Sequence, residues 1–125
     1  MPRLIGRVEA GLGDSGRWLT ILQEEYLRLT GVHLYPGTLN LRLAEPWRTP
    51  EGGQRLEASD YGGTVSVGLT PCRVGGRAAW ILRTDANEEG RGDHPLEVVE
   101  VAAEVRLRET LALVDGDLVE LELAP

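Results

Sequence analysis

The sequence predicts a mainly β domain, namely a small closed β-barrel of six strands with one or two short helices. Six short segments have the alternating or continuously apolar pattern of β-strands, whereas only two segments have the apolar spacing of helices. Stretches rich in Gly and Pro separate these segments. Several short strands with few helices favour a closed sheet over a doubly wound parallel one. The 125 residues contain no repeat or linker, so residues 1–125 are expected to form one domain.

The N-terminal third is expected to contain a strand, a glycine loop and a helix. Residues 4–10 alternate well enough for a strand, and residues 11–16, Gly-Leu-Gly-Asp-Ser-Gly, follow as a loop. Over residues 18–30 the apolar side chains recur at steps of three and four, which predicts a helix. Gly31 is then a suitable C-terminal stop.

The middle of the chain is expected to add strands over residues 38–43, 64–70 and 78–82. The last two of these strands flank a Gly75-Gly76 turn, which is typical of a β-hairpin. Residues 44–63 are rich in Pro, Gly and charged residues, so we expect most of them to form an irregular excursion.

The C-terminal third has the clearest pattern. Residues 84–94 form a second excursion, acidic and rich in Gly, which we expect to be mobile. Residues 96–102 are almost continuously apolar and predict a strand, whereas residues 104–111 have helical spacing. Residues 118–123 alternate again and predict the closing strand.

The charged residues exclude several kinds of site. The chain has 13 basic and 20 acidic residues, a net charge of −7, and every basic residue is Arg. Without Lys there is no Schiff-base lysine and no phosphate-loop lysine, so Arg, backbone N–H groups or a metal must bind any phosphate. The negative charge also opposes binding to duplex DNA or to an anionic membrane. We therefore expect small-molecule partners, no nucleic acid and no membrane.

Two further features concern the environment of the protein. No apolar run approaches the roughly 18–20 residues of a membrane span, and no apolar signal region precedes the first strand, so a cytoplasmic protein is expected. Cys72 is the only cysteine, which excludes an internal disulfide and favours a small buried hydrophobic residue over a nucleophile. A monomer or a small homo-oligomer is expected.

Thr38 and Asn40 form the first candidate site. They flank Leu39, so in an extended strand both polar side chains lie on one face while Leu39 points into the core. Two neutral oxygen ligands on one face suit Mg²⁺, which binds few protein groups and takes its other ligands from water and phosphate. The alternative is a pair of residues that caps the preceding Pro36-Gly37 turn.

The glycine loop is the second candidate site. Its glycines allow consecutive backbone N–H groups to turn toward one anion, which suits phosphate in a chain without Lys. The alternative is an ordinary turn between a strand and a helix. The candidate binding residues of this loop are Gly11, Leu12, Gly13, Asp14, Ser15 and Gly16.

Glu100 is the third candidate. A carboxylate inside the apolar strand at residues 96–102 is costly to bury without a partner, which favours a role in a site over exposure at the surface. Arg106 and Arg108 lie two apart, so on a helix their side chains diverge, and both could simply be solvated. One of the two could still neutralise phosphate.

These residues together resemble the archaeal-type, CTP-dependent riboflavin kinases, which are small cradle-loop barrels. The resemblance covers nearly the whole chain. It rests on Gly6-Arg7-Val8 before the glycine loop, on Pro36-Gly37-Thr38-Leu39-Asn40, and on the segments at residues 97–103, 107–109 and 113–119. The Pro-Gly-Thr-Leu-Asn signature is fairly specific, whereas the glycine loop alone is a weak motif.

The resemblance implies an Mg²⁺-dependent enzyme that transfers the terminal phosphoryl group of CTP to riboflavin and forms FMN. It implies that Thr38 and Asn40 bind Mg²⁺ and that the loop from Gly11 to Gly16 holds the nucleotide phosphates. Glu100 falls where the family has a carboxylate that contacts the flavin, and it is the candidate catalytic residue that orients the attacking hydroxyl. The residues implied to flank the nucleotide are Val105, Arg106, Leu107 and Arg108.

One element of the family's pattern is changed in this chain. A Thr-x-His or Thr-His-Tyr element is usual before the strand that carries the glutamate. Here Arg83-Thr84 is followed by an acidic, Gly-rich insertion that ends in Asp93-His94-Pro95. Thr84 and His94 are the candidates for contacting the acceptor substrate. The rings available to sandwich a flavin are Trp18, Tyr35, Tyr61 and Trp80.

Alternative functions stay open from the sequence. A sister kinase could act on a different small alcohol, or the barrel could be a non-catalytic nucleotide-binding, ligand-binding or regulatory domain. The segment at residues 107–122, a short helix followed by Asp-Gly-Asp and a strand, also resembles swapped-hairpin transcription regulators that share this barrel ancestry.

Overall fold

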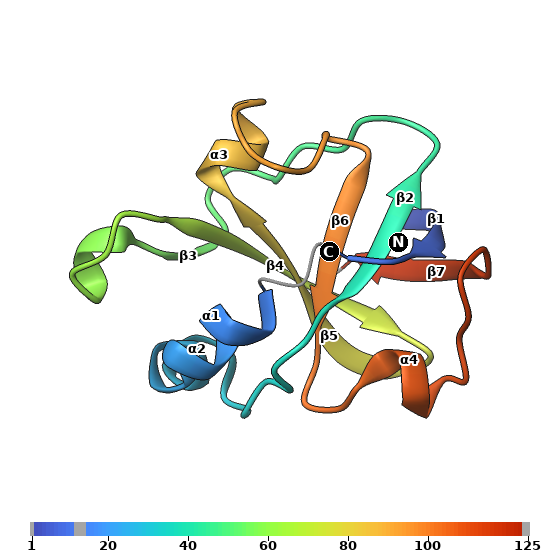
Figure 1. The fold of residues 1–125 in the computed structure, drawn as a ribbon, viewed down its shortest axis with the longest axis horizontal. Coiled ribbons are helices and arrows are strands. Elements are labelled where there is room, and N and C mark those ends of the chain that lie inside the picture. Colours follow the sequence, from blue (N-terminus) through green and yellow to red (C-terminus); the bar gives the residue numbers. More distant parts are fainter. Residues whose placement is uncertain (1, 12–14, 124–125) are drawn as a thin grey trace.

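The protein is a closed antiparallel β-barrel with short helices packed against its outside (Figure 1). The computed structural model describes residues 2–11 and 15–123. The strands of this part of the chain lie in the order β3-β4-β5-β6-β2-β1-β7, and a β4–β7 pairing closes the ring. They are β1 (Arg3–Glu9), β2 (Leu39–Leu43), β3 (Gln54–Leu56), β4 (Val67–Val74), β5 (Arg77–Thr84), β6 (Val98–Ala102) and β7 (Leu118–Leu123).

The barrel itself has six strands, which confirms the fold that the sequence predicts. β3 pairs only with the first half of β4, over residues 67–69, whereas β7 pairs with the second half, at Cys72 and Arg73. β3 is therefore an additional edge strand of the seven-stranded sheet, and the ring is β4-β5-β6-β2-β1-β7. Every pairing among the described strands is antiparallel.

Within residues 2–11 and 15–123 the connections contain four short helices and a 3₁₀ turn, more than the one or two helices expected. The single helix expected over residues 18–30 is in fact two helices, because Leu22 leaves the helical conformation with φ −101° and ψ 25°. Gly31 ends the second helix at φ 80°, which confirms the predicted stop. None of the described helices has the length and apolar character of a membrane span. The helical elements are α1 (Ser15–Ile21), α2 (Gln23–Thr30), α3 (Asp85–Glu88), α4 (Leu107–Thr110) and η1 (Ala58–Asp60).

The two excursions from the barrel have more regular structure than their composition indicates. Residues 44–63 contain β3 and η1, and the segment at residues 84–94 begins with α3. The strand expected over residues 64–70 begins at Val67 and continues to Val74. The helix expected over residues 104–111 is limited to α4. Gly and Pro identify where the chain leaves the barrel, but they do not reveal the short elements within those segments.

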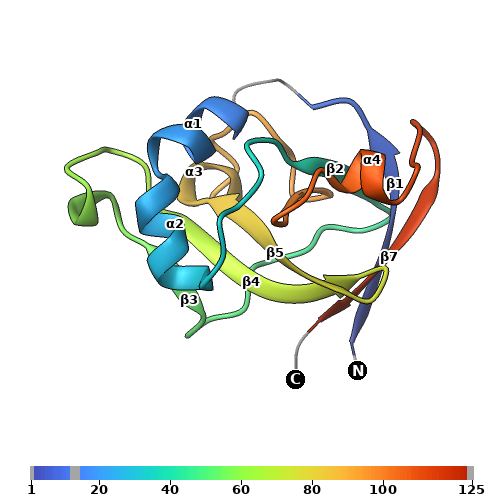
Figure 2. The ribbon, with the colours of Figure 1, turned by 90° about the horizontal axis from the view of Figure 1, so that it is seen from below.

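Two apolar cores share the sheet. The inner core fills the barrel and includes Leu41 and Val99, which are at most 1% exposed. The outer core lies between one outer face of the barrel and the helices α1 and α2, and it includes Leu19, Tyr26 and Leu82. Figure 2 shows α1 and α2 on the flank of the barrel formed by β3, β4 and β5, with α4 on the side of β1. The sheet is thus apolar on both faces where it passes under the helices.

Cys72 belongs to the inner core, where it is 4% exposed. Burial raises the pKa of its thiol to about 12. The thiolate, which is the reactive form, is therefore not populated at neutral pH. The prediction of a small buried hydrophobic residue is confirmed.

Arg83 is a buried cation that holds the first excursion against the barrel. Its guanidinium donates hydrogen bonds to the backbone carbonyls of Trp47, Leu96 and Val98, and it lies 5.2 Å from the centre of the Trp47 ring. Burial lowers the pKa of Arg83, while the carboxylate of Glu88 at 3.8 Å opposes that effect. One side chain thus adds to the contact between the backbone at Trp47 and the backbone at Leu96–Val98, where Trp47 N also donates to the Leu96 carbonyl.

We expect Arg83→Met to lower the free energy of unfolding by about 3 kcal/mol, because the carbonyl oxygens of Trp47 and Val98 would lose the guanidinium donor, whereas Leu96 would keep Trp47 N. Urea denaturation followed by circular dichroism measures this change. Arg73→Met is the matched control, since Arg73 is exposed and its side chain donates, within the described part of the chain, one hydrogen bond, to the Gly76 carbonyl. It should change stability by no more than about 0.5 kcal/mol. Equal effects of the two substitutions would contradict the role of Arg83.

Candidate functional site

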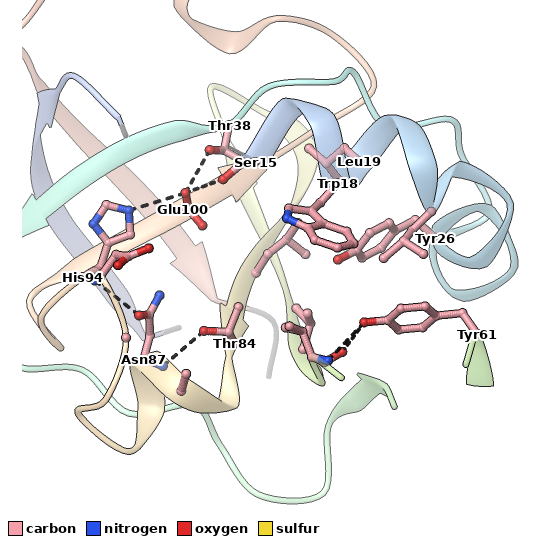
Figure 3. Close-up of a pocket in the computed structure, with 17 residues that line it drawn as sticks. Ser15, Trp18, Leu19, Tyr26, Thr38, Tyr61, Thr84, Asn87, His94 and Glu100 are labelled. Carbon is pink, nitrogen blue, oxygen red and sulfur yellow. Dashed lines mark hydrogen bonds and ion pairs between the residues drawn. The ribbon is translucent and has the colours of Figure 1, made fainter. Parts of the chain in front are cut away.

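A cavity of about 290 Å³ lies between the outer face of the barrel and the helices α1, α2 and α3 (Figure 3). One part of its wall is apolar and aromatic, with Trp18, Tyr26 and Tyr61 among its members. The other part is polar and includes Thr38 and Glu100. A cavity with an apolar wall and a few converging polar groups is the usual form of a small-molecule site.

The strand register brings the polar residues of this site together. Asn40 on β2 lies opposite Glu9 on β1 and Glu100 on β6, and Glu100 in turn lies opposite Leu82 on β5. Residues that are directly opposite each other have their side chains on the same face of a sheet. This row of four is on the outer face, because the neighbouring Leu41 fills the inside of the barrel.

Three side chains converge on one oxygen of Glu100. Its Oε1 accepts hydrogen bonds from Ser15 Oγ at 2.6 Å and from Thr38 Oγ1 at 3.4 Å, and His94 Nε2 lies 3.6 Å away. The side chains of Glu100 and His94 are only 18% and 13% exposed. The carboxylate therefore has the partners that its position in an apolar strand requires. His94 is not the exposed loop residue that a histidine next to proline often is.

Thr38 and Asn40 point toward the same place as Glu100. Thr38 Oγ1 lies 3.3 Å from Asn40 Oδ1 and 3.4 Å from Glu100 Oε1. Neighbouring ligands of an octahedral Mg²⁺ ion are about 2.9 Å apart, because each metal–oxygen distance is about 2.0–2.1 Å. In the described residues the Thr38 hydroxyl contacts Asn40 and Glu100, and neither Thr38 nor Asn40 has a side-chain hydrogen bond to the Pro36-Gly37 turn. These three oxygens are a donor set of the kind that Mg²⁺ prefers.

The described residues give less support to a metal site made of His, Cys, Asp or Glu side chains. Over residues 2–11 and 15–123, no group of three or more His, Cys, Asp or Glu side chains gathers in a way that could hold a metal ion. The hydroxyl and carboxamide of the β2 motif, with one carboxylate beside them, remain the candidate ligands.

The glycine loop and the Pro-Gly-Thr-Leu-Asn motif pack directly against each other. A Cβ atom on Gly11 would lie 2.1 Å from Asn40 Nδ2, and one on Gly16 would lie 2.6 Å from the Pro36 carbonyl oxygen. No side chain fits at either position without displacement of its neighbour. Leu12, Gly13 and Asp14, predicted to bind the nucleotide, lie outside the described residues.

The family of the chain follows from comparisons with known proteins. A family model named CTP-dep_RFKase, described as "Domain of unknown function DUF120", matches residues 8–123. A riboflavin kinase of Methanopyrus kandleri is 32% identical over 128 residues, which cover 95% of this chain and 81% of that protein. The chain belongs to the CTP-dependent riboflavin kinase family.

Other relatives in this family are longer than the chain. A riboflavin kinase of Methanocella arvoryzae is 34% identical over 98% of this chain and 57% of its own length. One of Pyrobaculum aerophilum is 36% identical over 97% of this chain and 60% of its own length. The chain thus spans somewhat more than half the length of these two relatives.

The second excursion supplies two walls of the cavity. The Thr84 hydroxyl accepts a hydrogen bond from Asn87 N at 3.1 Å and so caps α3 at its N-terminus. Asn87 Oδ1 accepts a hydrogen bond from His94 N at 3.2 Å. Thr84 and His94, the two residues predicted to contact the acceptor, both line the cavity. Asn87 joins them to each other, although no sequence motif marks it as a site residue.

The predicted nucleotide-flanking residues lie outside the lining of the cavity. Val105 and Leu107 pack against the inner core, Arg106 pairs with Glu109, and Arg108 pairs with Asp115. This segment is nevertheless close to the Pro36-Gly37 turn, because Tyr35 N donates to the Ala103 carbonyl at 2.7 Å. The role of residues 105–108 in nucleotide binding stays a prediction.

Only some of the expected aromatic residues are in the cavity. Trp18 and Tyr61 line it, whereas Tyr35 and Trp80 do not. Tyr26 lines it as well, although its spacing along α2 indicated only a core position. Burial, with smaller contributions from Tyr61 and Glu100, raises the pKa of Tyr26, so its phenol stays neutral.

We expect Gly11→Ala to displace the Asn40 carboxamide, because the added methyl group would occupy its place. Nuclear magnetic resonance should show shifted side-chain amide signals of Asn40, with a loss of stability of about 1–3 kcal/mol. The matched control is Gly53→Ala, where the nearest atom lies 3.7 Å from the added Cβ. Unshifted Asn40 signals in Gly11→Ala would show that the loop and the motif are not in contact.

Proposed function

We propose that the protein transfers the terminal phosphoryl group of CTP to riboflavin in an Mg²⁺-dependent reaction that yields FMN and CDP. The observation that carries this proposal is the position of Glu100. Its carboxylate stands beside the Thr38 and Asn40 oxygens, at the polar end of a cavity whose other wall is aromatic and apolar. The names of the relatives, riboflavin kinases, support the same activity.

The donor nucleotide is expected to bind at the glycine loop. Phosphoryl transfer depends mainly on positioning and on neutralisation of phosphate charge. In a chain without Lys, backbone N–H groups of residues 11–16 are the main candidates for binding the phosphates. The Pro36-Gly37 turn packs against Gly16 and lies next to Ala103, so a nucleotide bound here could extend to Val105–Arg108.

The acceptor is expected to bind along the cavity. Its apolar wall, with Trp18, Tyr26 and Tyr61, suits the flat ring system of a flavin. A ribityl chain could then reach the polar end, where Glu100 is placed to accept the proton of the terminal hydroxyl. The hydroxyl oxygen attacks the γ-phosphorus of CTP as this proton leaves. The bond from that phosphorus to the bridging oxygen breaks, and CDP departs with the electron pair.

Thr38 and Asn40 would hold Mg²⁺, with Glu100 adjacent. Bound Mg²⁺ neutralises charge on the phosphate oxygens. Ser15 Oγ donates to Glu100 Oε1, and Thr38 Oγ1 shares its one hydrogen between that oxygen and Asn40 Oδ1. These contacts orient the carboxylate, and its other oxygen, which has no hydrogen-bond partner among the described residues, would accept from a substrate hydroxyl. A cytoplasmic location stays an expectation.

The direct test is incubation of the purified protein with Mg²⁺, riboflavin and either CTP or ATP, followed by chromatography for FMN. FMN that forms with CTP, and stops forming when EDTA removes the metal, is the expected result. A rise in melting temperature with CTP and Mg²⁺ but no FMN would instead indicate a nucleotide-binding barrel or a different acceptor, provided that Thr38→Ala abolishes the rise.

We expect Glu100→Gln to lower kcat by about 10²- to 10⁴-fold, because the amide cannot accept the hydroxyl proton. Steady-state kinetics with CTP and riboflavin measures the change. Glu9→Gln is the matched control, since Glu9 lies across Asn40 in the same row but pairs with Arg42 at the surface. A kcat of Glu100→Gln within about threefold of the wild-type value would remove Glu100 from the chemical step.

A further inference from the structure

Asn87 and Gly92 fit together at the polar end of the cavity. Asn87 lies in α3, and a Cβ atom on Gly92 would be only 1.8 Å from Asn87 Oδ1. The Asn87 carboxamide thus occupies the space that a side chain at residue 92 would take. Both residues line the cavity together with His94.

The hydrogen bond to His94 decides the orientation of the amide. Because His94 N is a donor, the group that faces it must be the Asn87 oxygen, and Nδ2 must point the other way. Figure 3 shows this nitrogen on the side of the amide that faces the cavity. In the part of the chain that the structure describes, the buried side-chain atom without a hydrogen-bond partner is Thr49 Oγ1. Asn87 Nδ2 is not such an atom, which agrees with a position open to the cavity.

The neighbouring groups are mostly hydrogen-bond acceptors. Glu100 and Asp93 contribute carboxylates to this part of the wall. A hydroxyl that binds here can donate to either carboxylate, but its oxygen also needs a donor. Asn87 Nδ2 is a donor that keeps its hydrogens at every pH at which the protein is folded. An alcohol with several adjacent hydroxyls matches such a set of groups.

We propose that Asn87 is a specificity-determining residue for the acceptor, and that its Nδ2 donates a hydrogen bond to a hydroxyl of the polyol chain next to the one that is phosphorylated. This inference rests on the proposed function. It divides the recognition of the acceptor between two walls. The aromatic wall binds the ring, and Asn87 recognises the chain that carries the reacting hydroxyl.

Asn87→Asp separates the two roles of this side chain, which are to accept a hydrogen bond from His94 N and to donate one from Nδ2. The aspartate has the same shape and retains an oxygen for His94 N, but it loses the N–H donor. The ligands to compare are riboflavin and lumiflavin, which has the same ring system with a methyl group in place of the polyol. Binding is measured by flavin fluorescence with saturating CDP and Mg²⁺, so that no phosphoryl transfer occurs.

We expect Asn87→Asp to weaken riboflavin binding about five- to tenfold and to leave lumiflavin binding unchanged. Asn87→Ala should weaken riboflavin at least as much and should also lower the melting temperature, because it releases His94. Equal weakening of both flavins, or unchanged binding of riboflavin, would overturn the inference while the proposed function stands. Failure of the wild-type protein to bind riboflavin would overturn both.

Discussion

The register between β1, β2 and β6 is the constraint on which the candidate site depends. It aligns Asn40 and Glu100 on the outer face of the barrel, while Leu41 and Val99 fill the inside. A shift of one residue would turn the polar side chains into the apolar core and the leucine and valine out to the cavity. The inner core therefore fixes the register, and the register in turn fixes the distances between the site oxygens.

Two cores on one sheet explain why the site lies where it does. The helices α1 and α2 cover the outer face of β4 and β5, but α1 begins only at Ser15, beside Glu100. At that edge the apolar cover ends and the polar row of β2 and β6 begins. A ligand bound there contacts an aromatic surface and a fixed carboxylate at once. The 2.6 Å hydrogen bond from Ser15 to Glu100 also joins the glycine loop to the polar end of the cavity.

The sequence predicts the barrel well because its strands alternate and their turns contain Gly. It predicts the coordinates of the site less well, because these depend on tertiary contacts. α3 could have been found from Thr84, a good N-cap residue followed by Asp85 in the first turn. Nothing local shows that Arg83 is buried or that Asn87 fills the space over Gly92. The burial of Arg83 becomes visible only when β5 meets the backbone at Trp47 and Leu96, and the Asn87–Gly92 contact only when the loop after α3 folds back on the helix.

The absence of Lys bears on how a chain of net charge −7 could bind a triphosphate. Several of its Arg side chains are already paired with carboxylates: Arg42 with Glu9, Arg55 with Glu57 and Asp85, and Arg108 with Asp115. Arg83 is enclosed in the barrel wall and cannot reach a ligand without loss of three carbonyl contacts. Charge neutralisation by these side chains would require breaking existing pairs. Two other sources of positive charge require no ion pair to be broken: the backbone N–H groups of a glycine loop, and a cation held by neutral oxygens. We therefore expect the glycine loop and the β2 motif to act together.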